Sequence, residues 1–278
     1  MNLDFKKAIT DLFSLKYFWI YLLIFAVVTT LSSIIQSAHG IPYNSLISNV
    51  ISIFTYIATG YLFIMVNSLL NDKSLNIDDE TFGQNIWNCA KKGLKAFLGT
   101  LSNTIIGFLF GSLIAIISVF AFMKLTNNLI TENNLLSFPA LNIIFLLIAL
   151  FLMIYMLFVL KLLPVAYSEN FSLKMMFCWR KVLKKFFQKG NIKDTLSVIC
   201  IYAFSIIIIF LVMFSLMFLF NLIFVYFMKT LLMKNYVAVA FLINISSVIT
   251  PFAISMMHFI LSGFVYHLLG QIYKRTIE

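Results

Sequence analysis

The chain has 278 residues, of which 62% are hydrophobic and 11% charged, and its formal net charge is +10. A soluble domain is typically about 45–50% apolar and about 25% charged, because polar groups must cover much of its exterior. The composition therefore excludes an ordinary soluble protein and indicates a chain whose solvent is a lipid bilayer.

The first apolar stretch follows basic residues, as in a signal peptide. It is longer than the roughly 7–15 residues of a signal-peptide core and no small-residue cleavage site ends it, so we predict an uncleaved membrane helix. Similar stretches follow, and none alternates as barrel strands do. We predict an all-α polytopic membrane protein in one domain with six transmembrane helices. The predicted spans are about residues 17–35, 45–70, 97–123, 139–160, 196–227 and 236–269.

Two of the connections between spans contain amphipathic segments, at about residues 84–96 and 173–188. Each combines a tryptophan and apolar residues on one face with lysines on the other, a composition typical of helices that lie in the head-group plane. We predict two cytoplasmic interfacial helices that contact anionic lipid, and the alternative is that they bind a partner protein. The predicted head-group contacts are Lys91, Lys92, Lys95, Lys181, Lys184 and Lys185.

Positive charge is distributed unevenly about the six spans. Of the 20 Lys and Arg residues, all but Lys124, Lys229 and Lys234 fall on one side. The positive-inside rule makes that side cytoplasmic and places both termini there. We therefore predict a prokaryotic cytoplasmic membrane protein whose basic residues meet lipid head groups rather than nucleic acid.

Short motifs in the middle of the chain resemble a known family. They are Gly60-Tyr61-Leu62, the acidic stretch Asn76-Ile77-Asp78-Asp79, Lys92-Gly93-Leu94-Lys95-Ala96 and Leu163-Pro164-Val165-Ala166-Tyr167. This region, about residues 59–202, is similar to the uncharacterised prokaryotic multi-pass membrane proteins of domain-of-unknown-function family four-zero-one-three. The resemblance implies a topology and no activity.

The sixth predicted span carries the most polar residues. They form one stripe with a proline in its gap: Asn244, Ser247, Pro251, Ser255, His258 and Ser262. We expect this stripe to pack against neighbouring helices through its hydroxyl groups. The alternative is a kinked helix that lines a cavity, with His258 as its titratable group. No Asp, Glu, Lys or Arg lies well inside any predicted span, which weighs against proton-coupled transport.

The third predicted span contains Gly107 and Gly111, a spacing that allows close helix approach. We expect packing within the chain, with homodimerisation as the alternative. The three cysteines, Cys89, Cys178 and Cys200, form neither a disulfide framework nor a metal-ligand spacing. Nucleotide, metalloprotease and serine-hydrolase motifs are absent. We therefore predict no catalytic residue, no metal site, no cofactor and no enzymatic activity.

Two functional hypotheses follow. The first is an interaction or organising protein of the cytoplasmic membrane, held by its basic helices. The second is a carrier or channel for a small solute. A core filled with Phe, Ile and Leu favours the first, and a central polar cavity between the third and sixth spans favours the second.

Overall fold

The computed structural model describes residues 3–37, 44–71, 82–125, 139–231 and 236–277. Every regular element in these ranges is helical, as expected where lipid cannot satisfy backbone polar groups. In chain order the elements are α1 (Phe5–Ser14), α2 (Phe18–Ser37), α3 (Asn44–Ile53), α4 (Thr55–Leu70), α5 (Phe82–Leu125), α6 (Pro139–Leu157), the π-helix η3 (Phe158–Leu162), α7 (Leu163–Ser168), α8 (Leu173–Phe177), α9 (Trp179–Phe186), α10 (Ile192–Leu231) and α11 (Tyr236–Lys274).

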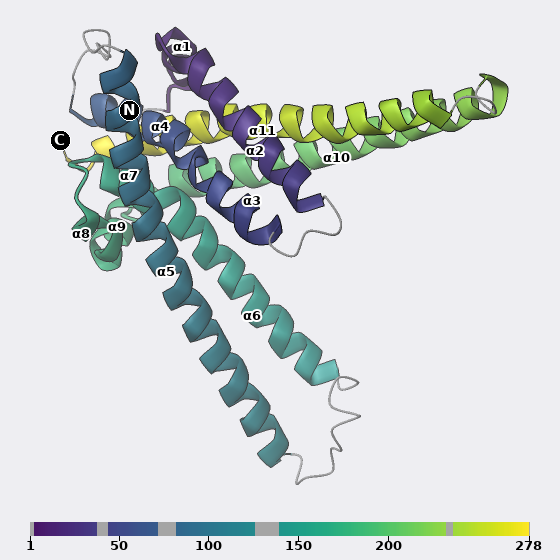
Figure 1. Cartoon of the computed structure of the whole chain (residues 1–278). Coiled ribbons are helices and arrows are strands. Elements are labelled where there is room, and N and C mark those ends of the chain that lie inside the picture. The colour runs from purple at the N-terminus through teal and green to yellow at the C-terminus, as the bar shows by residue number, and fades with distance from the viewer. Residues whose placement is uncertain (1–2, 38–43, 72–81, 126–138, 232–235, 278) are drawn as a thin grey trace.

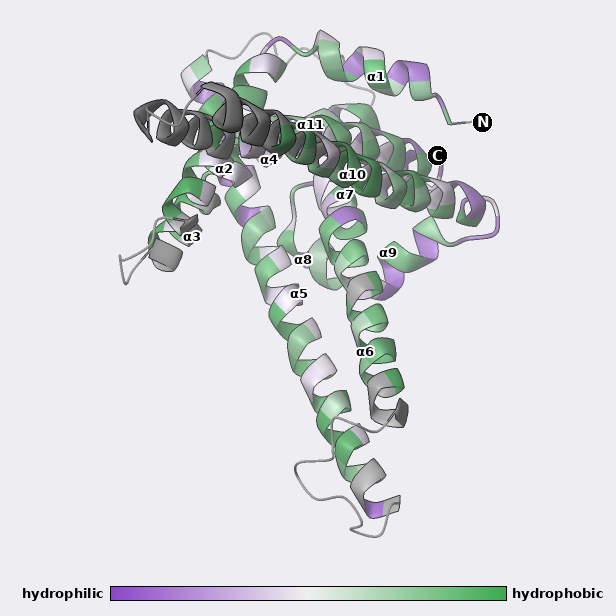
Figure 2. Ribbon diagram, turned by 90° about the vertical axis from the view of Figure 1, so that its right-hand side faces the viewer, coloured by the Kyte–Doolittle hydropathy of each residue, from purple (hydrophilic) through white to green (hydrophobic). Residues whose placement is uncertain are grey.

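Three helical arms diverge from a common base (Figure 1). The arms are the pairs α2–α3, α5–α6 and α10–α11, and the base contains α4, α7, α8, α9 and both ends of the chain. Hydrophobic residues run along the arms, whereas hydrophilic residues gather near α1 and α9 (Figure 2). Large apolar side chains such as Phe110, Leu146 and Phe210 are exposed on the arms. Such a surface suits contact with lipid rather than with water.

Helices long enough to cross a membrane confirm the predicted all-α, multi-pass class. Within the described ranges there are five of them: Phe18–Ile35, Phe82–Ala121, Phe145–Ser168, Ile192–Val212 and Val248–Lys274. The second predicted span is built differently, because α4, although apolar, has only 16 residues. About 20 residues are needed for a straight crossing.

The second predicted span bends at Phe54, between α3, which packs mainly against α2, and α4, which packs against α5 and α11 as well as α2. The bend is a tight turn in which Phe54 N–H donates to Ile51 C=O at 3.0 Å. On one side, Ser48 of α3 and Ser32 of α2 exchange hydrogen bonds, each hydroxyl donating to the other's carbonyl at 3.0 Å. On the other side α4 turns towards α5.

The crossing of α4 and α5 is a backbone-on-backbone contact. A Cβ atom built on Gly60 would collide with the Cys89 carbonyl, and one built on Gly93 would collide with the Tyr56 carbonyl. Only glycine permits so close an approach. The crossing therefore positions Tyr56 and the first turns of α4 against α5.

The predicted interfacial helix at residues 84–96 is not a separate element, because it forms the first turns of the 44-residue helix α5. No proline interrupts the backbone ladder between the amphipathic and apolar parts. The face buried in the protein carries Asn85, Cys89 and Ala96, whereas Trp87 is 71% exposed. The glycine contact decides which side of α5 packs against the protein. The face that carries Trp87 stays exposed, and its predicted contact with lipid head groups remains a prediction.

The second amphipathic segment, 173–188, is divided at Cys178 into α8 and α9. Asn103 of α5 holds both sides of the break. Its Nδ2 donates to Met176 C=O at 3.1 Å, and Trp179 Nε1 donates to its Oδ1 at 2.8 Å. Tyr155 of α6 donates to the Asn103 carbonyl at 2.7 Å. Trp179 is therefore anchored to the bundle, and it is the basic face of α9 that points outwards.

A short amphipathic helix, α1, precedes the first span and was not predicted. Asp4 caps it by accepting from Lys7 N–H at 2.7 Å, and Ala8 and Leu12 are buried. His267 of α11 lies 2.9 Å from Asp11 Oδ2, which fastens α1 to the base. The cap and the four-residue spacing of its buried residues are signals that the sequence carried.

We expect Gly93→Ala to lower the free energy of unfolding by about 1–3 kcal/mol, because the added methyl group overpacks the crossing. Gly83→Ala in the same helix is the control. No atom lies within 4 Å of a Cβ built there, so this change should be neutral or stabilising by up to about 1 kcal/mol. Unfolding in mixed detergent micelles measures both. Equal effects of the two substitutions would contradict the assigned crossing.

Candidate functional site

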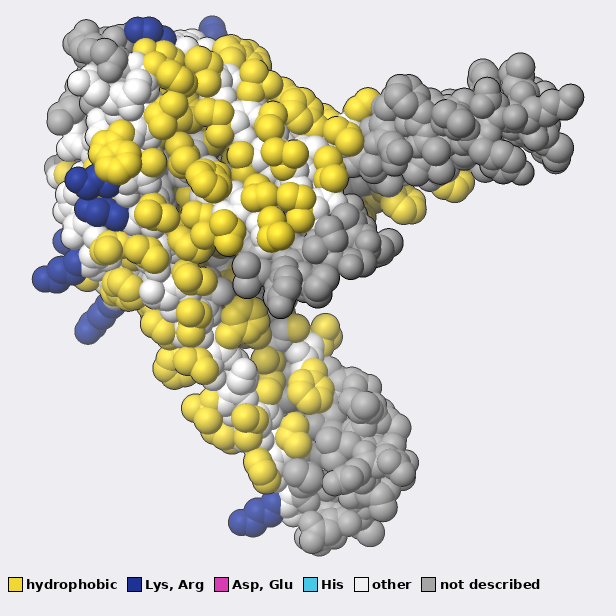
Figure 3. Space-filling view, in the orientation of Figure 1, with side chains coloured by type: hydrophobic (Ala, Val, Ile, Leu, Met, Phe, Trp, Pro, Cys, Tyr) yellow, Lys and Arg dark blue, Asp and Glu magenta, His cyan; other side chains and the backbone are white. Residues whose placement is uncertain are grey.

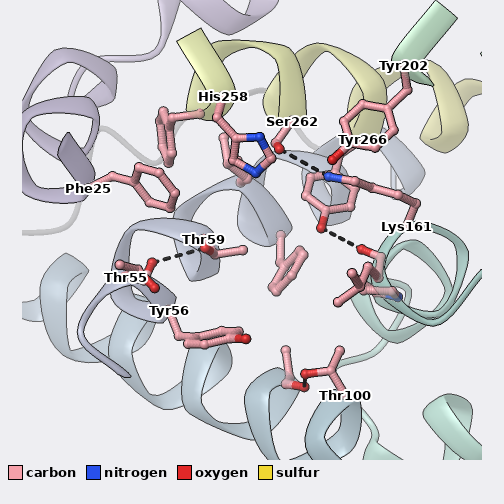
Figure 4. Close-up of a pocket in the computed structure, with 16 residues that line it drawn as sticks. Phe25, Thr55, Tyr56, Thr59, Thr100, Lys161, Tyr202, His258, Ser262 and Tyr266 are labelled. Carbon is pink, nitrogen blue, oxygen red and sulfur yellow. Dashed lines mark hydrogen bonds between the residues drawn. The ribbon is translucent and has the colours of Figure 1, made fainter. Parts of the chain in front are cut away.

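A cavity of about 250 Å³ lies where the arms converge on the base (Figure 4). Its walls come from α2, α4, α5, η3, α7, α10 and α11. The labelled side chains of Lys161, His258 and Tyr56 approach it from different helices. The cavity is thus bounded by the third and sixth predicted spans, among others.

Lys161 enters this cavity from the π-helix η3. The π-turn is caused by Pro164, two residues beyond its end. Pro164 has no N–H and cannot donate to the carbonyl one turn earlier. The Leu160 carbonyl instead accepts from Tyr266 Oη of α11 at 2.9 Å. Leu163 N–H bonds to Phe158 C=O, the wider spacing of a π-turn. Such turns recur at functional sites because they redirect side chains.

Lys161 is only 7% exposed. Its Nζ donates to Ser262 Oγ at 3.1 Å, and it lies 4.2 Å from the ring centroid of Tyr202 and 4.9 Å from that of Tyr266. Aromatic faces attract an ammonium group through their quadrupole. The prediction that no charged residue lies well inside a span was therefore wrong, since the apolar helix Phe145–Ser168 contains Lys161.

No carboxylate of the described ranges balances this lysine. Asp4 caps α1, and Asp11 lies beside His267. Glu169 pairs with a lysine and Asp194 with an arginine elsewhere in the base. Within the same ranges Lys161 itself makes no ion pair with a carboxylate. An amine on one wall of an otherwise uncharged cavity is an arrangement suited to hold an anion.

The predicted stripe of the sixth span is partly in this cavity. His258 and Ser262 line it, and the His258 imidazole stacks on Phe25 with ring centroids 6.3 Å apart. Ser255 is buried outside the lining, and α11 continues through Pro251. The side chains of Asn244 and Ser247 lie outside the described residues. The stripe therefore both packs and lines a cavity.

The opposite wall presents hydroxyl groups from α4 and α5. Thr59 Oγ1 donates to Thr55 C=O at 3.0 Å, and Thr100 Oγ1 donates to Phe97 C=O at 2.9 Å. Both protons are thus committed to the helices' own backbones. Lys161 Nζ and Ser262 Oγ are thus the two adjacent polar atoms of the cavity that keep donors for a ligand.

The other predicted residues have structural surroundings. Gly107 and Gly111 lie against Tyr155 and Leu152 of α6, which is contact within the chain. Among the predicted head-group lysines, most are exposed, and blue side chains gather around the base in Figure 3. The exposed ones are Lys91, Lys95, Lys181 and Lys184.

The two remaining lysines are engaged with the protein. Lys92 Nζ lies 4.2 Å from the Phe171 ring centroid. Lys185 Nζ lies 3.5 Å from Glu169 Oε2 and donates to Tyr273 Oη at 3.0 Å. Tyr273 Oη in turn donates to Glu169 at 2.7 Å. Through these contacts Lys185 links α9 to the end of α7 and to α11, and it balances the charge of Glu169.

Within the described ranges, no three His, Cys, Asp or Glu side chains come together as metal ligands would. No protein-family model, curated protein or solved structure matches the chain. The candidate site is therefore defined by its geometry alone.

The sequence pattern indicates His258 and Ser262 but not Lys161, because the fourth predicted span ends at residue 160. The overlooked signal was the run Leu162-Leu163-Pro164-Val165-Ala166-Tyr167, which continues the apolar stretch on the far side of the lysine. The proline within that run marks the backbone irregularity. A lone lysine flanked by apolar residues on both sides indicates a buried charge.

We expect Tyr266→Phe to lower the free energy of unfolding by about 1–3 kcal/mol, because it leaves the Leu160 carbonyl without its partner. Tyr202→Phe is the matched control. It keeps a ring beside Lys161, and the Tyr202 hydroxyl has no hydrogen bond to the described residues, so its effect should stay within about 0.5 kcal/mol. Comparable losses from both substitutions, measured in mixed micelles, would contradict the role assigned to the hydrogen bond between Tyr266 and the Leu160 carbonyl.

Proposed function

We propose that this chain is a non-enzymatic multi-pass membrane protein that binds a small solute in the central cavity and carries it across the membrane. The observation behind the proposal is the buried Lys161 on the wall of that cavity. Ionisable residues within membrane spans are rare because they are costly, and they commonly mark solute pathways.

The cavity lies at the meeting point of the arms, which supports a role in passage. Residues from α4, α5, α10 and α11 line it together. A change in how the arms diverge would change the cavity walls directly. These features favour the carrier over an organising protein, whose core needs no polar space.

The exposed lysines of the base support a second role, compatible with the first, in orienting the protein in the membrane. Lys181 and Lys184 are exposed on α9, beside the anchored Trp179. Each lysine near an anionic surface contributes about 1 kcal/mol. We place this base and both termini on the cytoplasmic side of a prokaryotic cytoplasmic membrane.

Filling the cavity tests the carrier proposal. Proteoliposomes are loaded with panels of small neutral, anionic and cationic solutes, and flux is followed by light scattering. Wild-type protein should accelerate at least one class over protein-free liposomes, and Thr59→Phe should reduce that flux at least tenfold because the ring occupies the cavity. Thr29→Phe is the matched control, since Thr29 makes the same bond to a carbonyl four residues earlier but lies outside the lining.

The carrier proposal is abandoned if no solute crosses faster with wild-type protein than without protein. It is also abandoned if Thr59→Phe and Thr29→Phe reduce the flux equally, because the effect would then not come from the cavity.

Cysteine labelling tests the orientation. Single cysteines replace Gln188, an exposed residue of the base, or Lys124, an exposed residue in the last turn of α5, in a background without the native three. In intact cells a membrane-impermeant maleimide should label Lys124→Cys and leave Gln188→Cys unlabelled until the cells are opened. The reverse pattern would place the base outside.

A further inference from the structure

Two hydrogen-bond donors, the Lys161 ammonium group and the Ser262 hydroxyl, lie next to each other on one wall of the cavity. An ammonium group has three N–H donors and a serine hydroxyl has one O–H donor. Lys161 uses one donor on Ser262 Oγ at 3.1 Å. That bond uses the hydroxyl oxygen as acceptor and leaves its proton for another partner. Two adjacent donors at this spacing match the two oxygens of a carboxylate.

The charge balance points to a single negative charge. Lys161 is the cationic side chain among the described lining residues, and none of those residues is Asp or Glu. An uncompensated charge is expensive in an apolar interior, and one opposite charge removes the penalty. A second negative charge would find no partner, and a cation would be repelled.

The remaining walls favour an apolar body on the anion. Phe25, Phe63 and Phe259 present aromatic surface to the cavity, with Leu62 beside them. Its volume of about 250 Å³ accommodates a small organic molecule and excludes a whole phospholipid. Chloride would leave most of this space apolar and unfilled.

We infer that the solute is a small monocarboxylate, whose carboxylate binds Lys161 and Ser262 and whose apolar part lies against the aromatic walls. This inference rests on the proposed function and adds the chemical class of the solute.

Three probes of similar size test the charge requirement without any mutation: butyrate, its isosteric amide butyramide, and butylammonium. Each is added to the purified full chain in detergent at pH 7, where a carboxyl group is ionised, and the thermal unfolding midpoint is followed. Butyrate should raise the midpoint in a saturable manner. The amide, the ammonium compound and sodium chloride at equal concentration should bind at least tenfold more weakly.

Two substitutions then locate the binding. Lys161→Met should abolish the butyrate-induced shift, while the midpoint without ligand stays equal or rises, because a buried charge without a partner has been removed. Ser262→Ala should weaken butyrate binding roughly tenfold. Lys181→Met, which changes an exposed lysine, should leave the shift unchanged.

The outcomes separate the two proposals. If butyramide binds as tightly as butyrate, or if Lys161→Met keeps the butyrate shift, the carboxylate inference is overturned and the solute cavity stands. If chloride alone reproduces the shift, the ligand is an inorganic anion and the inference is again overturned. If no probe binds and no solute crosses proteoliposomes, both proposals fall.

Discussion

The contact between Gly60 and Gly93 is the constraint on which the rest of the structure depends. It brings the backbones of α4 and α5 together without intervening side chains. On the other side of the bend at Phe54, Ser48 of α3 bonds to Ser32 of α2. The same contact positions Thr59 and Thr100 as one wall of the cavity.

The opposite wall depends on a proline. Pro164 removes a backbone donor, the helix widens to a π-turn, and Tyr266 satisfies the Leu160 carbonyl. The hydroxyl bond holds the Tyr266 ring beside Lys161 Nζ, at 4.9 Å from its centroid. One local irregularity therefore directs the lysine into the cavity and supplies part of its surroundings. The carbonyl bond and the cation–π contact thus come from one side chain, its hydroxyl and its ring.

Composition and apolar length were enough to predict the membrane class, because they report the solvent of the chain rather than its contacts. They could not predict where helices bend or merge. Residues 84–96 carry an apolar stripe that includes Trp87, yet the small residues Cys89, Gly93 and Ala96 pack inwards. Which face packs depends on the contact with α4, a separate helix that the apolar pattern of residues 84–96 does not describe. The family resemblance, which includes Gly60 and Gly93, stays a prediction.

Lys161 fell on the boundary of a predicted span because a charged residue ordinarily ends one. Here the helix continues, and the ammonium group is held by one hydroxyl and two aromatic rings. This is less than a buried charge needs for full compensation, and an apolar residue of similar volume would commonly be more stable at such a position. Packing alone therefore gives no reason for a lysine there. An anionic ligand does give a reason. The uncompensated charge of Lys161 lowers the stability of the unliganded fold, and an anion that compensates this charge on binding gains the corresponding free energy.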